Sequence, residues 1–369
     1  MSIHAVPLWV GTHPPDGLGT PVGKGEGVWR AQMKGDGSLT AEQVAVMPAP
    51  SFVAAHPTLP LVYAVCEDVP AALHVISADS PFAVLSTVDL GGADACHVLL
   101  APGERTLYIT LYASGELVVV RLAPDGLPEG DNPQQRFAYQ GSGPRADRQE
   151  AAHAHQAVVA PGGNHVVVCD LGSDTLWAHE RREDGSLGPP TVATRFPPGS
   201  GPRHAAVHGE HLYVVCEIDH HLRTVRWDRA SGTGEIVAEQ PTTLAAQRTG
   251  EDVFDAHVTV VAGPTGHVLL ASVRGPDVIA VFDLAPEGEA RYRAAFDSGH
   301  WPRHFAVVTD AEGNEHVVVA AGRGHELRSF AVQDILALPP ETEAGAIATL
   351  AHASAAVTSP ACIAAVLGT

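Results

Sequence analysis

Histidine, arginine and acidic residues stand at matching places beside the hydrophobic segments of this 369-residue chain. His155, Arg203 and Arg303 each precede such a segment, whereas Glu217 and Arg274 each follow one. A carboxylate or an imidazole can take a proton from water, and a fixed guanidinium can stabilise the oxyanion that forms when water attacks a carbonyl group. These residue types would be adequate for a lactone, whose ring ester is already reactive, but weak for an amide.

One phrase recurs seven times along the chain: a short polar opening, a hydrophobic strand, a turn and a second hydrophobic strand. Its period is roughly fifty residues, which is typical of a β-propeller. We therefore predict a single all-β domain over residues 1–369, folded as a seven-bladed β-propeller. The seven opening triplets are Pro50-Ser51-Phe52, Ala95-Cys96-His97, Ala154-His155-Gln156, Pro202-Arg203-His204, Asp255-Ala256-His257, Pro302-Arg303-His304 and Pro360-Ala361-Cys362.

The two ends of the chain each supply only part of a blade. Residues 8–10, 27–30 and 41–46 have the pattern of second, third and fourth strands, and residues 361–366 have the pattern of an inner strand. The N- and C-terminal strands are therefore predicted to share one blade, which leaves no free sheet edge in the ring.

Blade geometry predicts which of the chemically active residues meet. The start of an inner strand lies beside the end of the second strand, because the two strands form an antiparallel hairpin. Both sets of residues should then share one mouth of the central channel, where a ligand would bind. The inner-strand set is His155, Arg203 and Arg303, and the second-strand set is Asp170, Glu217 and Arg274.

Histidines at one repeated position allow two interpretations. A side chain that recurs in this way can bond neighbouring blades as a buried polar group, or it can bind substrate. The repeated histidines are His97, His204, His257 and His304. His153 and His155 also form a His-x-His pair that could hold a metal, although we expect neither a metal nor another cofactor.

The overall charge of the chain limits the kinds of partner that it can bind. A formal net charge of −20 argues against nucleic acid and membrane surfaces, and the N-terminus lacks the basic region of a secretion signal. We therefore expect a cytoplasmic protein, a monomer or weak homodimer, whose partner is a small anionic molecule.

The Gly-rich segment 12–27 is expected to lie near the substrate, and the charges of Arg145, Asp147 and Arg148 in segment 128–153 are expected to be solvated.

The chain resembles the seven-bladed propeller lactonases, which include bacterial propeller-type 6-phosphogluconolactonases and fungal 3-carboxymuconate-lactonising enzymes. The resemblance extends from near residue 50 to the end of the chain. The stretches that carry it are Ala152-His153-Ala154-His155, Gly199-Ser200-Gly201-Pro202-Arg203-His204, Tyr213-Val214-Val215-Cys216-Glu217, Ala271-Ser272-Val273-Arg274-Gly275, Pro302-Arg303-His304-Phe305 and Ser359-Pro360-Ala361-Cys362-Ile363.

The resemblance implies an active site made of His155, Arg203, Glu217 and Arg274, with no need for a metal. The chain departs from the family pattern at Cys216, where the family has an asparagine that could orient the glutamate. This departure and the replaced prolines of the family's PHPH phrase bear on the identity of the substrate more than on the fold.

We predict hydrolysis of a sugar-acid lactone, with 6-phosphogluconolactone as the first candidate. Either His155 or Glu217 would be the base that activates water; we favour Glu217 as the base, with His155 donating a proton to the leaving alkoxide. Arg203 and Arg274 would bind the anionic group and the oxyanion. The residues expected to bind substrate around them are His153, His204, His257, Arg303 and His304. Lactonisation of a muconate and a non-catalytic binding scaffold are the alternatives.

Overall fold

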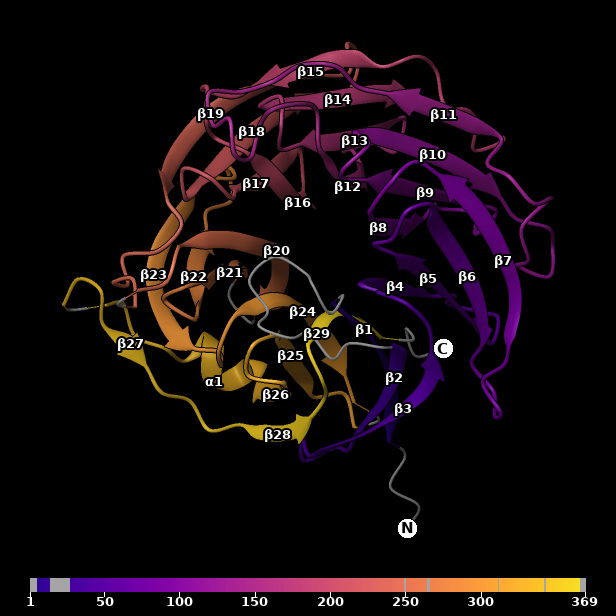
Figure 1. The fold of residues 1–369 in the computed structure, drawn as a ribbon. Coiled ribbons are helices and arrows are strands. Elements are labelled where there is room, and N and C mark those ends of the chain that lie inside the picture. Colours follow the sequence, from indigo (N-terminus) through magenta and orange to yellow (C-terminus); the bar gives the residue numbers. More distant parts are fainter. Residues whose placement is uncertain are drawn as a thin grey trace.

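Seven β-sheets stand like blades around a central channel in the computed structural model (Figure 1). The structure describes residues 5–13, 27–248, 250–263, 266–310, 312–341 and 343–365. Each sheet runs outward from the channel, and its inner strand touches the inner strands of the two neighbouring blades. The predicted all-β seven-bladed propeller is confirmed.

The first three blades follow one another directly along the chain, each with four antiparallel strands. Blade 1 consists of β4 (Phe52–Ala55), β5 (Leu61–Cys66), β6 (Ala71–Ser77) and β7 (Val84–Gly91). Blade 2 consists of β8 (Ala95–Leu100), β9 (Thr106–Leu111), β10 (Glu116–Arg121) and β11 (Gln135–Ala138). Blade 3 consists of β12 (Ala154–Val159), β13 (His165–Asp170), β14 (Thr175–Glu180) and β15 (Thr191–Arg195).

The next three blades keep the same order from the channel outward, and two of them receive a short strand from the segment after the helix α1 (Val332–Leu336). Blade 4 consists of β16 (Pro202–His208), β17 (His211–Cys216), β18 (His221–Asp228) and β19 (Thr233–Pro241). Blade 5 consists of β20 (Phe254–Gly263), β21 (Gly266–Arg274), β22 (Val278–Leu284), β23 (Ala290–Asp297) and β27 (Ile347–Ala348). Blade 6 consists of β24 (Pro302–Thr309), β25 (Glu315–Ala321), β26 (Glu326–Ala331) and β28 (Ala353–Ala356).

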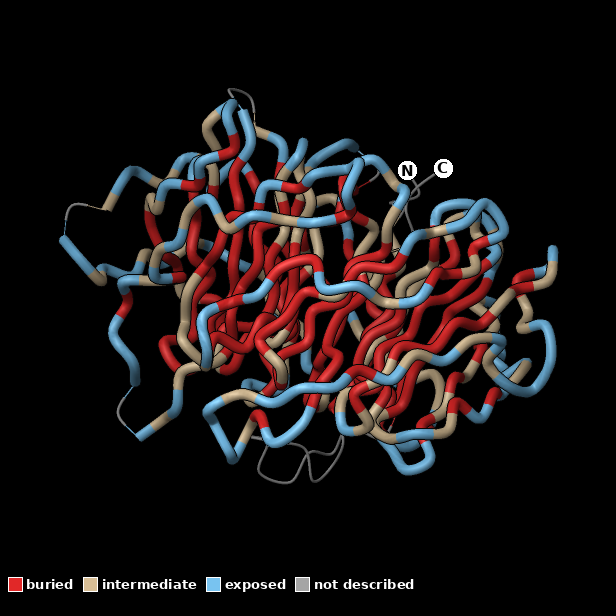
Figure 2. The backbone as a smooth tube through the Cα atoms, turned by 90° about the horizontal axis from the view of Figure 1, so that it is seen from above, coloured by how far each residue is buried: buried red, intermediate tan, exposed pale blue. Residues whose placement is uncertain are grey.

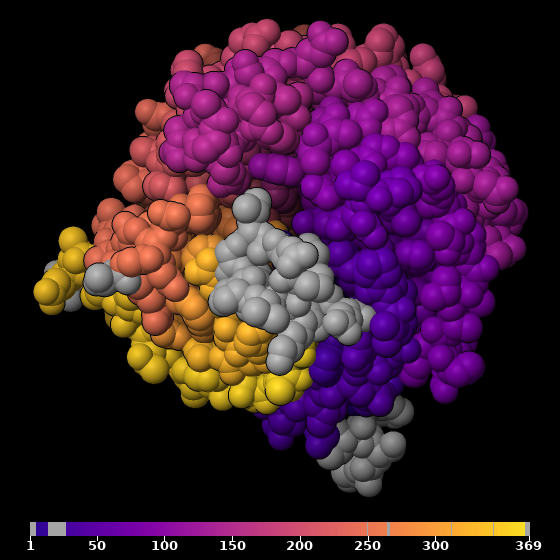
Figure 3. Space-filling model, in the orientation of Figure 1, coloured from indigo at the N-terminus to yellow at the C-terminus, as the bar shows by residue number. Residues whose placement is uncertain are grey.

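Blade 7 joins the two ends of the chain. Its inner strand is the C-terminal β29 (Pro360–Ala365), which pairs with the N-terminal β1 (Val6–Thr12), followed by β2 (Gly27–Met33) and β3 (Leu39–Val46). Yellow C-terminal and indigo N-terminal parts of the surface lie against one another in the space-filling view (Figure 3). The predicted sharing of one blade by the terminal strands is confirmed.

Burial follows the position of each strand within its blade. The second strand β5 is buried at every residue because neighbouring blades cover both of its faces, whereas the outer strand β19 alternates between exposed and half-buried residues. Buried residues accordingly lie along the strands and exposed residues lie in the loops at both ends of the channel (Figure 2).

A repeated tyrosine links blades to one another. Tyr63 in blade 1 is fully buried, and its hydroxyl group donates a hydrogen bond of 2.9 Å to the carbonyl oxygen of Gly126 in blade 2. Tyr108 makes the matching bond with Gly185, at 2.8 Å, between blades 2 and 3. A buried tyrosine hydroxyl needs such a partner, so these bonds fix how adjacent blades pack and hold the ring in register.

Candidate active site

β-Bulges at the starts of the inner strands position the predicted site residues. In blade 3, Ala154 pairs with Asp170 and Gln156 pairs with Cys169, so that His155 is the additional residue on β12. Arg203 in β16 and Arg303 in β24 are additional residues in the same way. A bulge turns a side chain away from the ordinary alternation of a strand, and here it brings all three side chains to the channel.

A cavity of about 1380 Å³ occupies the channel on this side of the ring, and every blade contributes to its lining. Arg274 and Glu217 reach it from the ends of second strands, and His155, Arg203 and Arg303 reach it from the bulges. The structure therefore brings together five of the residues that the sequence placed at one mouth.

Glu217 lies at the centre of three arginine side chains. Its Oε2 atom lies 2.7 Å from Nε of Arg203 and 2.7 Å from Nη2 of Arg274, and its Oε1 atom pairs with Nη2 of Arg148. Arg274 also lies over the rings of Phe254 and Trp301, with its guanidinium carbon 5.2 Å and 5.6 Å from the ring centroids. Both carboxylate oxygens of Glu217 are thus engaged by cations.

Arg148 is a candidate site residue that the sequence interpretation missed. We expected its charge to be solvated in the segment 128–153, but only about a sixth of its side chain is exposed, and its guanidinium carbon lies 5.3 Å from the ring centroid of Phe254. Neighbouring Arg145 and Asp147 do form an exposed pair, at 3.2 Å. The path of a loop depends on contacts with distant residues, so local sequence gave no signal for Arg148.

The charges around Glu217 and His155 set their protonation at neutral pH. Burial alone would raise the pKa of Glu217, but Arg274, Arg148 and Arg203 hold it well below the usual 4.5. Burial, together with the charge of Arg203, lowers the pKa of His155 well below 6.5. Glu217 is therefore ionised and His155 is neutral.

Arg303 differs from the other arginines of the cavity. Its guanidinium group makes neither a hydrogen bond nor an ion pair with any residue that the structure describes. Burial lowers the pKa of Arg303 to about 10, which keeps the group charged at neutral pH. Arg303 therefore offers an unoccupied fork of N–H donors to an anionic ligand.

Three of the residues expected to bind substrate form a layer beneath the main cavity. Nδ1 of His204 and Nδ1 of His257 are joined by a hydrogen bond of 2.9 Å, and the rings of His257 and His304 lie 4.0 Å apart. Burial lowers the pKa of all three, that of His304 to about 3. His204 and His304 line a second, smaller cavity, whereas His257 lines neither one. These contacts fit the architectural interpretation of the repeated histidines.

The structure does not bring His153 or Asp170 into the cavity. The bulge at His155 interrupts the alternation of side chains, and the His153 ring instead stacks on Tyr112 with 4.5 Å between centroids. Asp170 is fully buried and accepts hydrogen bonds from Trp177 and from the backbone N–H of His153. Both residues support the loops behind the cavity wall.

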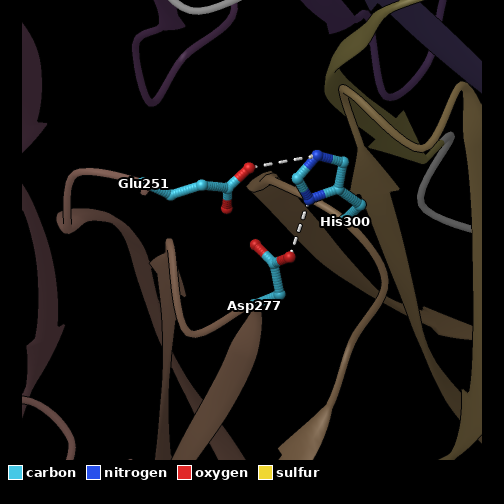
Figure 4. A group of neighbouring side chains, drawn as sticks. All are labelled: Glu251, Asp277 and His300. Atoms are coloured by element: carbon cyan, nitrogen blue, oxygen red, sulfur yellow. Dashed lines mark hydrogen bonds and ion pairs between the residues drawn. The ribbon is translucent and has the colours of Figure 1, made fainter. Parts of the chain in front are cut away.

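Three side chains of the types that bind metal ions, Glu251, Asp277 and His300, lie close together at the rim of the main cavity. Nδ1 of His300 lies 2.7 Å from Asp277 and its Nε2 lies 3.5 Å from Glu251 (Figure 4). Arg248 lies 3.1 Å from Asp277, and Arg323 lies 3.4 Å from Glu251. These guanidinium groups already pair with the acids and would repel a metal ion, so the cluster ties the loop that carries Glu251 to the rim. Most of the Gly-rich segment 12–27 lies outside the described residues.

Comparison with known proteins assigns the chain to a family. Residues 7–363 match the family described as "Lactonase, 7-bladed beta-propeller". The chain belongs to this family. Among curated proteins, a 6-phosphogluconolactonase of Bacillus subtilis is 30% identical over 231 residues, which cover 61% of this chain and 62% of that protein. The chain therefore matches less than two thirds of that relative.

Solved structures show the same fold. A protein from Lactobacillus plantarum has a TM-score of 0.79 at 19% identity, with 98% of this chain and 99% of that chain covered. A periplasmic gluconolactonase of Pseudomonas aeruginosa has a TM-score of 0.77 at 22% identity, with 99% of each chain covered. In the described ranges, no helix is long and apolar enough to cross a lipid bilayer.

Proposed function

We propose that this protein hydrolyses a sugar-acid lactone. The observation that carries the proposal is the floor of the main cavity, where the neutral imidazole of His155 stands among arginines that Glu217 fixes in place. A neutral imidazole can accept a proton from water, and fixed guanidinium groups can stabilise an oxyanion. Membership in the lactonase family supports the same reaction.

The contacts of Glu217 favour His155 as the base, which reverses the roles expected from the sequence. Both oxygens of Glu217 are paired with arginines, and these cations weaken it as a proton acceptor. Glu217 then serves as the anchor of Arg203 and Arg274. A guanidinium about 4 Å from an oxyanion contributes about 4 kcal/mol at an effective dielectric near 20.

Arg303 is the residue that we assign to the anionic group of the substrate. Its guanidinium makes no hydrogen bond or ion pair with the described residues, lines the same cavity as His155 and stays charged at neutral pH. A phosphate or carboxylate would pair with two of its N–H groups at once. This assignment favours 6-phosphogluconolactone over a neutral sugar lactone, in accord with the name of the Bacillus subtilis relative.

The test measures acid release from freshly made 6-phosphogluconolactone and from glucono-1,5-lactone by EDTA-treated protein, against the uncatalysed rate. We expect rapid hydrolysis of the phosphorylated lactone. Hydrolysis of the neutral lactone alone would support lactone hydrolysis but would contradict the assignment of Arg303 to a phosphate group. Activity on neither lactone would contradict the proposal and would turn attention to muconate lactonisation or a binding scaffold.

The location and assembly of the protein belong to the same proposal. We infer a cytoplasmic enzyme that acts as a monomer or weak homodimer on a small anionic substrate, with no nucleic-acid or membrane partner and no cofactor. Cell fractionation and sedimentation of the purified protein would check the first two statements.

A further inference from the structure

Glu67 occupies in blade 1 the position that Glu217 occupies in blade 4. The two acids end matching segments, Tyr63-Ala64-Val65-Cys66-Glu67 and Tyr213-Val214-Val215-Cys216-Glu217, directly after the second strand of each blade. Blades 1 and 4 are three places apart, the largest separation in a ring of seven. Because both acids line the main cavity, their carboxyl groups approach it from opposite sides.

The surroundings of these two carboxyl groups differ. Arginines hold Glu217 on both oxygens, whereas the ion-pair contact recorded for Glu67 is a long one, 3.8 Å from Oε2 to Nε2 of His13. Burial raises the pKa of Glu67, and nearby Arg303 and Ser51 offset this only in part. A carboxyl group whose pKa burial raises can hold a proton and donate it as a general acid.

A small cavity connects Glu67 with His155. Its volume is about 20 Å³, which exceeds the roughly 10–15 Å³ that one water molecule requires. It shares Glu67, Cys96, His155, Arg203 and Arg303 with the main cavity, and its other polar lining residues are Ser51, His204 and His304. A single water molecule held here would have polar partners on both sides and could carry a proton between Glu67 and His155.

We propose that Glu67 is the general acid of lactone hydrolysis and that the small cavity returns its proton from His155. This inference rests on the function proposed above, in which His155 is the base. It assigns a proton donor to the ring oxygen that leaves, a role that Glu217 cannot fill because Glu217 is ionised and surrounded by arginines.

The proposed steps balance. His155 takes one proton from water as the water oxygen bonds to the carbonyl carbon, and the carbonyl electron pair moves onto its oxygen, which becomes an oxyanion. When the C=O bond forms again, the bond from that carbon to the ring oxygen breaks, and the ring oxygen takes the proton of Glu67. The His155 imidazolium then returns a proton to the Glu67 carboxylate through the small cavity. The net change is lactone plus water to hydroxy acid.

The experiment compares wild type and Glu67→Gln on a sugar lactone and on its thiolactone analogue, in which sulfur replaces the ring oxygen. An alkoxide needs a proton to leave, whereas a thiolate does not. We expect Glu67→Gln to lower kcat for the lactone by about 10²–10⁴ and to change kcat for the thiolactone far less. Equal losses on both substrates, a change in KM alone, or unchanged kcat would overturn the proposal.

The pH profile gives a second readout for the case in which wild type does not turn over the thiolactone. The wild-type kcat should fall as pH rises and Glu67 ionises, and Glu67→Gln should lose that limb. A limb that persists in the variant would overturn the proposal. The other titratable and charged groups around Glu67 are His13, Asp68, Asp94, Cys96, His155, Arg203, His204, Arg303 and His304.

Asp79→Asn is the matched control, because it removes one negative charge from an exposed position of the same blade, outside the lining of both cavities. Its kcat should match that of wild type. Thermal unfolding of both variants would show that they fold. If wild type hydrolyses the lactone and Glu67→Gln does so equally well, only the role of Glu67 fails. If wild type hydrolyses no lactone, the proposed function fails as well.

Discussion

Arg203 and Arg274 meet at a single oxygen atom of Glu217. Nε of Arg203 and Nη2 of Arg274 each lie 2.7 Å from Oε2, although the two arginines come from different blades. Arg148 reaches the other oxygen from the loop that joins blades 2 and 3. One buried carboxylate therefore holds three cations that would otherwise repel one another, and several consequences of this arrangement can be measured.

Replacement of Glu217 should disable the site. We expect Glu217→Gln to lower kcat at least a hundredfold, because Arg203 and Arg274 lose the charge that holds them in position. Removal of one partner from a buried ion pair also costs about 3–5 kcal/mol, so the melting temperature should fall while the fold persists. Steady-state kinetics and thermal unfolding measure the two effects.

A matched control is Glu239→Gln on the outer strand of the same blade. Glu239 pairs with Arg223 at 3.1 Å, and more than half of its side chain is exposed. Kinetics of this variant should match wild type. A normal rate in Glu217→Gln would contradict the anchoring role.

The pH dependence of the reaction should reflect the depressed pKa of His155. A base acts in its unprotonated form, and the pKa of His155 lies well below 6.5 because the residue is buried near Arg203. Activity should therefore persist below pH 6.5 and disappear only as pH falls through the depressed value. A kcat/KM profile with an inflection at the ordinary histidine pKa would count against this.

His155→Gln should lower kcat by about 10²–10⁴, the usual contribution of a general base, with little change in KM. His74→Gln in blade 1 is a suitable control, since the His74 ring bonds Thr87 on the outer part of that blade. Wild-type kcat in His155→Gln would exclude His155 as the base.

Arg303 should control the affinity for the anionic group of the substrate. We expect Arg303→Gln to raise KM for the phosphorylated lactone about 10- to 100-fold, because a hydrogen bond to a charged group is worth about 1.5–3 kcal/mol. The KM for the neutral lactone should change much less. Arg105→Gln is the control, since Arg105 is exposed and pairs with Glu129. Equal effects on both lactones would instead place Arg303 at the reacting carbonyl.

Asp255 should make the folded state less stable at alkaline pH. The residue is fully buried, and burial raises its pKa to about 8 in the folded protein from 3.8. The folded state therefore retains a proton that the unfolded state has lost, so this contribution to stability is complete below about pH 4 and declines as pH rises through 8.

Asp255→Asn should remove this decline, because its amide oxygen can still accept the hydrogen bond that Thr242 donates to Asp255. Denaturant unfolding at pH 5 and pH 8.5 would show the difference. If the variant and wild type lose stability equally over this range, Asp255 is not the group responsible.

Much of the fold could be predicted because a repeated sequence imposes repeated geometry. Each opening triplet starts an inner strand, so residues at the same position in different triplets lie at the same height in the ring, and His155, Arg203 and Arg303 reach one cavity. The closure of the ring could be predicted in the same way. The N-terminal strands lacked an inner strand to pair with β1, and the C-terminal segment that forms β29 supplied it.

Other features depend on contacts between residues that are distant in sequence. The sequence marked Arg148 as one charge among several in a loop, and only the folded chain places it against Glu217 and Phe254. The sequence also treated His153 and His155 as a pair, but His155 lines the main cavity whereas the His153 ring stacks on Tyr112.

By itself, the sequence determined the propeller, its closure by the two termini and the gathering of His155, Arg203 and Arg303 at one cavity. It could do so because hydrophobic periodicity and repeat spacing are local properties of the chain. The tertiary structure alone decided which arginines Glu217 holds and that Arg303 makes no hydrogen bond or ion pair with the described residues. The tertiary structure also decided which side chains of the cavity are protonated, because a pKa depends on burial and on charges that several blades bring together.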